Sequence, residues 1–194
     1  GGKLVAENGK MLHQKEKNTD WSTEIKERVF HSFHRVPITV EELQLKETTG
    51  THQRVIDMVA HELITKERIE EWKELPGVAP GVDISRDIVK LAAIERHKNT
   101  GHVGLGFLGK YGLKKGAVAT SIGHDSHNLV IAGVTDEDMV LAGNRVIENG
   151  GGLAIALEGK VLADLPLPIG GLMADEPVEV VDEKLEHMKK LSVE

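Results

Sequence analysis

The strongest pattern of apolar and polar positions lies between residues 116 and 134. Two short apolar runs, residues 117–122 and 129–134, flank five polar residues at positions 124–128. The runs are rich in β-branched and small side chains and are bounded by glycines, so they predict two buried strands joined by a polar loop. Two imidazoles, a carboxylate, a hydroxyl and an amide are costly in such a loop unless they are paired or used. The loop is therefore the first candidate for a functional site.

The pattern after this loop alternates between helical and strand periods. Residues 135–149 repeat apolar positions at helical spacing behind a capping Thr135, which predicts a helix. Residues 153–157 and 160–165 alternate around Glu158-Gly159 and predict a hairpin. A last helix is expected after Asp175 as its cap, with apolar residues spaced by three and four. The apolar stripe of this helix consists of Val178, Val181, Leu185, Met188 and Leu191. We expect the stripe to pack on the sheet, and the alternative is that it packs on a partner chain.

The pattern in the first part of the chain is weaker. Asn8-Gly9 between short alternating runs is a hairpin signal. Residues 22–35 are expected to begin as a helix capped by Ser22 or Thr23. Residues 51–60 and 61–72 alternate loosely and predict a pair of strands, with a helix across residues 66–75 as the alternative.

Composition narrows the class of protein. The 194 residues suffice for one good core, or one core and a small satellite. A formal charge of −7 argues against a protein that binds a nucleic-acid backbone through a basic face. The lack of cysteine excludes disulfides, thiolate zinc sites and cysteine nucleophiles. No apolar run approaches the ~20 residues of a membrane span, and no signal pattern is present. We expect a cytoplasmic protein without nucleic-acid or membrane partners.

Strands and helices intermix from Ile84 onward, so the predicted fold class is mixed α/β (α+β), a sandwich of sheet and helices. Two weaker motifs lie within the chain. Glycines at 104, 106, 109 and 112 nearly match a dinucleotide fingerprint, but close backbone packing is the better interpretation. His31 and His34 would share a helix face and could bind a metal, but no third ligand stands at a fixed spacing.

Several segments together resemble adenine deaminases, which are members of the amidohydrolase superfamily. The central segment is His124-Asp125-Ser126-His127-Asn128 with its apolar flanks. The resemblance covers residues 84–192 strongly and the first 80 residues more loosely. The other matching segments are residues 94–97 (Ile-Glu-Arg-His), 104–116, 136–139, 150–152, 165–169 and 171–173.

The resemblance implies an enzyme that converts adenine and water to hypoxanthine and ammonia in purine salvage. In that superfamily, metal ions in a catalytic barrel activate the water, and a His-x-His pair typically opens the ligand set. This sequence contains no His-x-His. The chain is therefore similar to the C-terminal portion of an adenine deaminase without the barrel. Mn²⁺ or Fe²⁺ is expected in the missing barrel and no metal on this chain, and the fragment alone is expected to be inactive.

The resemblance also implies a division of the chain. Residues 1–47 are expected to be the remnant of a small β domain and a linker, whose other strands are not in this sequence. Residues 48–194 are expected to form the adenine deaminase C-terminal-type domain. The expected partners are adenine, the catalytic barrel domain and further copies of the chain in a homo-oligomer.

The candidate site follows from the same segments. We expect the polar loop to reach the barrel mouth and to contact adenine or a proton path. The alternative is structural: Asp125 and Ser126 tie a tight loop through backbone bonds, and the imidazoles are satisfied within the domain. The predicted catalytic residues are His124, Asp125 and His127, and the predicted substrate-binding residues are Ser126, Asn128, Glu95 and His97.

Two other classes of function stay open from the residues alone. The chain could be a free-standing module that binds a purine or a metal through His124 and His127. It could also be an assembly domain that dimerises through the apolar stripe of its last helix. A Ser-His-Asp hydrolase fits poorly, because all three residue types lie within four positions.

Overall fold

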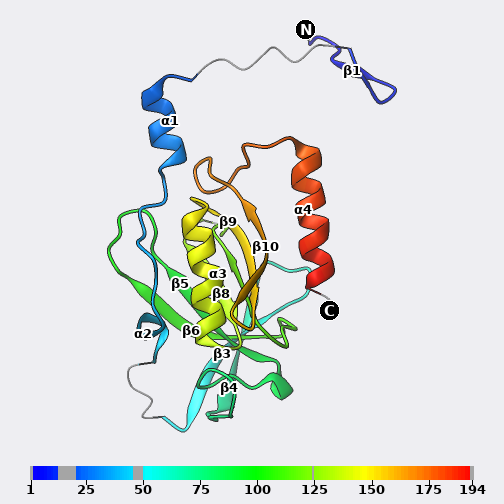
Figure 1. The fold of residues 1–194 in the computed structure, drawn as a ribbon. Helices are drawn as coiled ribbons and strands as arrows, with labels where there is room; N and C mark the ends of the chain where they lie inside the picture. Colours follow the sequence, from blue (N-terminus) through cyan, green and yellow to red (C-terminus); the bar gives the residue numbers. More distant parts are fainter. Residues whose placement is uncertain (1, 13–20, 46–49, 124, 193–194) are drawn as a thin grey trace.

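An eight-stranded sheet forms the body of the molecule (Figure 1). The computed structural model describes residues 2–12, 21–45, 50–123 and 125–192. The strand order is β10-β9-β7-β8-β5-β6-β3-β4, and every pair is antiparallel except β3 with β6. The strands are β3 (His52–Met58), β4 (Thr65–Glu71), β5 (Ile88–Ile94), β6 (Val103–Gly109), β7 (Ala117–Thr120), β8 (Leu129–Gly133), β9 (Gly152–Leu157) and β10 (Lys160–Pro166).

Two helices cover opposite faces of the sheet, which confirms the predicted mixed α/β sandwich. Strand side chains alternate between the two faces. On β9, Ala154 and Ala156 join the main core with α3, whereas Leu153 and Ile155 pack with α4. The helical elements are α1 (Thr23–Phe30), α2 (Val40–Leu43), the 3₁₀ turn η1 (Ile84–Arg86), α3 (Asp136–Glu148) and α4 (Val178–Leu191).

The hairpin predicted at Asn8-Gly9 is present as β1 (Ala6–Glu7) and β2 (Lys10–Met11). Both turn residues have positive φ, 49° and 74°, as a two-residue hairpin turn requires. All of its residues are exposed, and it lies apart from the body of the molecule (Figure 1). The hairpin therefore has no core of its own, and the polar linker expected after it at residues 14–20 lies outside the described residues.

Helix α1 has the expected Ser22 cap, whose hydroxyl accepts from the Ile25 amide. It ends at Phe30, five residues before the predicted end at Arg35. His31 is then the C-cap, and His34 lies beyond the helix, where its amide donates to the Arg96 carbonyl at 2.8 Å. The two histidines therefore do not share a helix face.

The strand pair predicted in residues 51–72 is confirmed as β3 and β4, and the helical alternative is wrong. The glycine-rich segment forms β6. A Cβ atom at Gly109 would lie 2.1 Å from Asp57 Oδ1 and 2.6 Å from Arg68 Nη2. Close packing therefore explains glycine at position 109. The same expectation is wrong for Gly106 and Gly112, where a Cβ atom would meet nothing within 4 Å, and for Gly104, where the nearest atom would be the Ala93 carbonyl oxygen at 3.8 Å.

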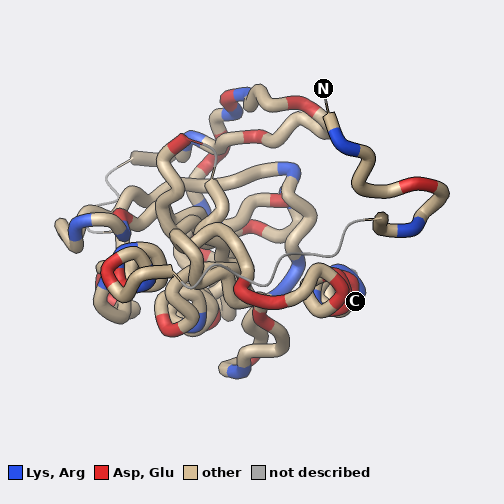
Figure 2. Tube along the Cα trace, turned by 90° about the horizontal axis from the view of Figure 1, so that it is seen from above, with Lys and Arg blue, Asp and Glu red and all other residues tan. Residues whose placement is uncertain are grey.

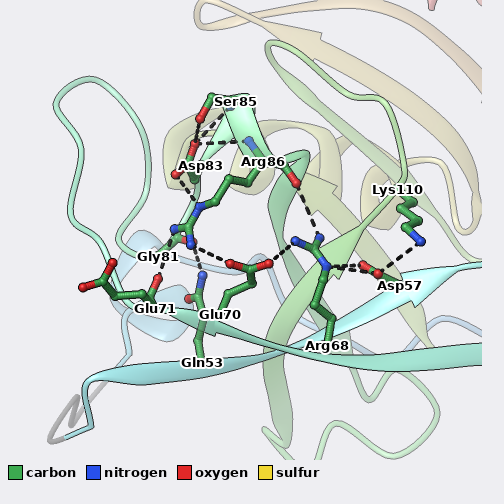
Figure 3. Close-up of polar contacts among 10 residues, drawn as sticks. All are labelled: Gln53, Asp57, Arg68, Glu70, Glu71, Gly81, Asp83, Ser85, Arg86 and Lys110. Atoms are coloured by element: carbon green, nitrogen blue, oxygen red, sulfur yellow. Dashed lines mark hydrogen bonds and ion pairs between the residues drawn. The ribbon is translucent and has the colours of Figure 1, made fainter.

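A polar network fastens the β3–β4 hairpin to η1 (Figure 3). Arg68 Nε lies 3.0 Å from both carboxylate oxygens of Asp57. Glu70 lies between two guanidinium groups, accepting from Arg68 at 2.6 Å and from Arg86 at 2.8 Å. These hydrogen bonds hold the pKa of Glu70 below its usual value. Arg86 also binds Asp83 at 2.6 Å, so the charged groups of this corner pair with one another.

The helices of the second half agree with the pattern, with one correction. Thr135 caps α3 by accepting from the Asp138 amide. The N-cap of α4 is Pro177 rather than Asp175, so the helix begins two residues later than expected and without a side-chain cap. Only part of the α4 stripe is buried: Met188 is 6% exposed, whereas Leu185 is 42% exposed. No helix in the described part of the chain is long and apolar enough to cross a membrane.

Acidic and basic residues are intermixed along the described chain (Figure 2). One charged pair is buried where the first turn of α3 meets the sheet. Lys90 on β5 is fully buried and donates to Asp136, the first residue of α3, at 2.7 Å. This pair is expected to fix α3 against the sheet, because removing one partner would leave a buried charge unpaired.

Candidate functional site

One end of the sheet collects segments that are far apart in the sequence. Strand β5 ends there beside the start of β8 and β6, since Ile94 pairs with both Leu129 and Val103. Strand β7 ends beside the start of β9, since Thr120 pairs with Leu153. The loop of residues 121–128, the turn of residues 95–102 and the connection of residues 167–177 all leave from this end. We call it the loop end of the sheet.

The β7–β8 loop is held by its backbone. Asp125 and His127 have positive φ, 69° and 48°, which non-glycine residues adopt only when neighbours hold them there. The His127 amide donates to the Gly123 carbonyl at 2.9 Å. The loop carbonyls of Ser126 and His127 bind side chains of the β5–β6 turn: His97 Nε2 lies 2.8 Å from the first, and Arg96 Nε 2.6 Å from the second. The turn therefore fixes the loop conformation.

The side chains of the loop differ in exposure. Asp125 and Ser126 are exposed, and His127 and Asn128 are half-buried. His124, predicted as catalytic, lies outside the described residues. The structure thus brings Asp125, Ser126, His127 and Asn128 together with His97 at the loop end, and their role as a single site stays a prediction.

His127 has a buried ring nitrogen, Nδ1, without a hydrogen-bond partner among the described residues. Buried polar atoms are usually paired, and an unpaired one costs about 1–3 kcal/mol. Within the described residues, this ring nitrogen is therefore available for a hydrogen bond. An unpaired atom at this position is what a group that binds a ligand or another domain would show before binding.

Glu95 uses its carboxylate on the turn that follows it. The carboxylate accepts from the amides of Thr100, Lys98 and His97 at 2.9, 2.8 and 2.5 Å, and from the Thr100 hydroxyl at 2.9 Å. These hydrogen bonds, that of the Thr100 amide first, lower the pKa of Glu95 to about 2. Glu95 therefore shapes the turn that carries His97, and the structure directs its carboxylate inward to that turn.

Arg96 is the residue of the site that the sequence analysis missed. It is 2% exposed, and burial lowers the pKa of its guanidinium. Its hydrogen bonds go to three backbone carbonyls, those of His127, Gly170 and Ser32. A signal was present: Ala92 and Ile94 on β5 are buried, and continuing the alternation places Arg96 on the same face. A charged residue on a buried face requires hydrogen-bond partners, so the alternation alone would have identified Arg96 as a candidate residue of the site.

Glycines and a serine fasten the remaining segments to the loop end. Ser121 is fully buried, donates to the Gly171 carbonyl at 2.6 Å and accepts from the Gly152 amide at 2.7 Å. Gly171 has φ of 74°, and a Cβ atom there would lie 2.7 Å from Arg96 Nη1. A Cβ atom at Gly151 would lie 2.3 Å from Gly171 Cα. Only glycine permits this close approach of three segments.

The described residues contain no cluster of three or more His, Asp or Glu side chains that could hold a metal ion. His31, which the sequence analysis considered as a metal ligand, instead has its Nδ1 atom 3.0 Å from Glu27 Oε2 on α1. The donor set of the described residues therefore does not fit a metal centre.

Comparison with known proteins agrees with the geometry. A family described as "Adenine deaminase C-terminal domain" matches residues 62–194. Adenine deaminase of Lysinibacillus sphaericus is 40% identical over 185 residues, which is 95% of this chain and 31% of the relative. Adenine deaminase 2 of Carboxydothermus hydrogenoformans is 40% identical over 191 residues, 98% of this chain and 32% of the relative. Adenine deaminase of Oleidesulfovibrio alaskensis is 48% identical over 151 residues, 78% and 26% respectively. The chain spans about a third of the length of such relatives.

Proposed function

The chain belongs to the adenine deaminase C-terminal domain family, and from this premise we propose that it is the C-terminal part of an enzyme that deaminates adenine. The proposed reaction takes adenine and water to hypoxanthine and ammonia. Relatives that share the whole chain carry the name adenine deaminase, and this chain corresponds to about a third of each. The activity accordingly belongs to the complete enzyme, and the chain alone is inactive.

The observation that carries the proposal is the loop end of the sheet. The segments that resemble the family at residues 94–97, 121–128, 150–152, 165–169 and 171–173 are far apart in the sequence, yet hydrogen bonds join this region there, that between Arg96 and Gly170 across 74 positions. The backbone of the loop is held by the domain, and Asp125 and Ser126 are exposed. We propose that this end faces the catalytic part of the enzyme.

The loop offers the groups that hydrolytic deamination requires from its surroundings. The reaction must protonate a tetrahedral intermediate and release ammonia, which positioned imidazoles and carboxylates can assist. In our proposal His124, Asp125 and His127 handle protons. The Ser126 hydroxyl and the Asn128 amide each donate and accept, and so can pair with the edge of a purine. His97 and Glu95 complete the substrate side, with Glu95 acting through the turn.

The metal of the parent enzyme has no place in this part of the proposal. The described residues do not form a metal centre, so we assign the proposed Mn²⁺ or Fe²⁺ to the part of the relatives that this chain does not cover. No step proposed for the loop passes through a metal held by this chain.

Finer expectations follow from the same assignment. The enzyme would serve purine salvage in the cytoplasm, consistent with a cysteine-free chain. A second role, assembly into a homo-oligomer, is favoured by α4, where Val178 and Leu185 are 72% and 42% exposed on the helix that packs Val181 and Met188 on the sheet.

The test is a double substitution, His127→Ala with Asn128→Ala, in the full-length enzyme. We expect kcat/KM for adenine to fall by about 100-fold or more, because a positioned acid or base contributes about 10²–10⁴-fold. The midpoint of thermal unfolding should stay close to that of the wild type. His102→Ala, an exposed histidine on the β5–β6 turn that does not bind the loop, is the matched control. Wild-type kinetics in the double variant would contradict the proposal.

A further inference from the structure

Arg96 is a buried cation whose hydrogen bonds to the described residues reach no carboxylate. Transfer of a charge from water into a protein costs free energy unless partners replace the water. The replacement here consists of three backbone carbonyls and the face of Phe33, whose ring centre lies 4.9 Å from the guanidinium carbon. A residue whose burial is costly thus serves to bind backbone carbonyls.

The three carbonyls belong to three separate segments. His127 in the β7–β8 loop accepts from Nε at 2.6 Å, Gly170 before α4 accepts from Nη2 at 3.1 Å, and Ser32 after α1 accepts from Nη1 at 3.5 Å. The first bond is the shortest, and it ends on a residue with positive φ. The peptide that carries this carbonyl joins His127 to Asn128, so its orientation sets the directions of both side chains.

We propose that Arg96 is a positioning residue for the β7–β8 loop, fixing the peptide between His127 and Asn128 so that both side chains face the substrate. The geometric part stands on the contacts of Arg96 alone, and the consequence for turnover rests on the proposed function. A planar guanidinium offers five N–H donors in fixed directions, whereas a lysine ammonium is a point charge on a flexible stem. Arg96→Lys therefore keeps the charge but cannot reach three carbonyls at once.

Arg35 provides a matched comparison within the same chain. It is also buried, at 6% exposure, but its guanidinium pairs with the Glu42 carboxylate in the conventional way. It belongs to the segment before α2, and within the described residues its side-chain hydrogen bond goes to Glu42 rather than to the β7–β8 loop. Arg35→Lys should thus weaken the fold without changing the loop.

Hydrogen exchange of the loop amides tests the geometric part on the chain itself. In Arg96→Lys we expect amides of residues 121–128, that of His127 included, to exchange about tenfold faster, the effect of losing a net hydrogen bond or two. In Arg35→Lys their rates should match the wild type. Equal loop exchange in wild type and Arg96→Lys would overturn the inference. If Arg96→Lys does not fold, Phe33→Leu, which removes the ring face over the guanidinium, should accelerate the same amides, and unchanged rates would overturn it equally.

Kinetics of the full-length enzyme separate this inference from the proposed function. A misdirected loop should lower kcat more than it raises KM, whereas general destabilisation, as in Arg35→Lys, should lower only the active fraction. Faster loop exchange with unchanged kcat would leave Arg96 as the residue that holds the loop and would contradict the role of the loop in turnover. Lower kcat with unchanged loop exchange would overturn the positioning role.

Discussion

At the scale of single residues, the loop end is built from side chains that bind backbone. Glu95 accepts from three amides, Arg96 donates to three carbonyls, and Ser121 joins two glycine-containing segments. Such hydrogen bonds fix the backbone of loops, whose N–H and C=O groups have no partners in a helix or a sheet. The loop therefore owes its conformation both to bonds within it and to side chains of the β5–β6 turn.

Glu95 gives a pH-dependent prediction. Its pKa is about 2 in the folded chain against a usual 4.5, so its stabilising effect is present above about pH 4.5 and is lost as the pH falls toward 2. Glu95→Gln should lower the midpoint of thermal unfolding at pH 6, because an amide places N–H groups against the turn amides. Scanning calorimetry from pH 6 to pH 2 should show the difference from wild type shrinking as the wild-type carboxylate is protonated. A difference that is constant over this range would contradict the assigned hydrogen bonds.

The sequence predicted which residues gather at the loop end, and the roles assigned to them stay predictions. The polar loop and the turn after β5 were found from pattern and resemblance, and they meet as expected. Arg96 was missed, because the alternation of β5 was not continued past Ile94. The inward orientation of Glu95 depends on the turn of residues 96–100, whose backbone conformation no spacing rule predicts. His124 lies outside the described residues, so its role stays a prediction.

At the scale of elements, the helices and strands of the second half followed the pattern closely. Periodicity and caps located α3 and the β9–β10 hairpin, because their local preferences agree with their packing. The end of α1 was placed too late, since residues 31–35 keep polar–apolar spacing but leave the helix, and Ser32 and His34 bind Arg96 through their backbone. Periodicity also could not predict which residues of the α4 stripe pack on the sheet, as Met188 does, and which stay exposed, as Leu185 does.

The division of the α4 stripe predicts unequal effects of truncation. Met188→Ala should cost about 2–5 kcal/mol of unfolding free energy, because it removes a side chain buried against Leu165 and Leu167. Leu185→Ala should change the free energy by about 0.5 kcal/mol, as exposed positions usually do. Urea unfolding of both variants checks this. Equal losses would mean that Leu185 is also buried, and sedimentation of Leu185→Asp would then show whether a second copy covers it.

At the scale of the whole molecule, the chain is one sandwich with an exposed hairpin at its N-terminal side (Figure 1). The hairpin and α1 bury no residue of their own, whereas the sheet, α3 and α4 share a core. Since relatives are about three times as long, we propose that the loop end and the hairpin are completed by the rest of the enzyme. The lack of a His-x-His pair in the sequence led to the same expectation.

The central claim is that the β7–β8 loop lies at the adenine site of the complete enzyme, and photo-cross-linking measures this most directly. The full-length enzyme is irradiated with an 8-azido derivative of adenine, with and without excess adenine, and digested with trypsin. Cleavage after Lys115 and Arg145 isolates the loop in one peptide. The account predicts label on that peptide, within residues 121–128, that excess adenine removes. Adenine-protected label confined to the part of the enzyme outside this chain would contradict it.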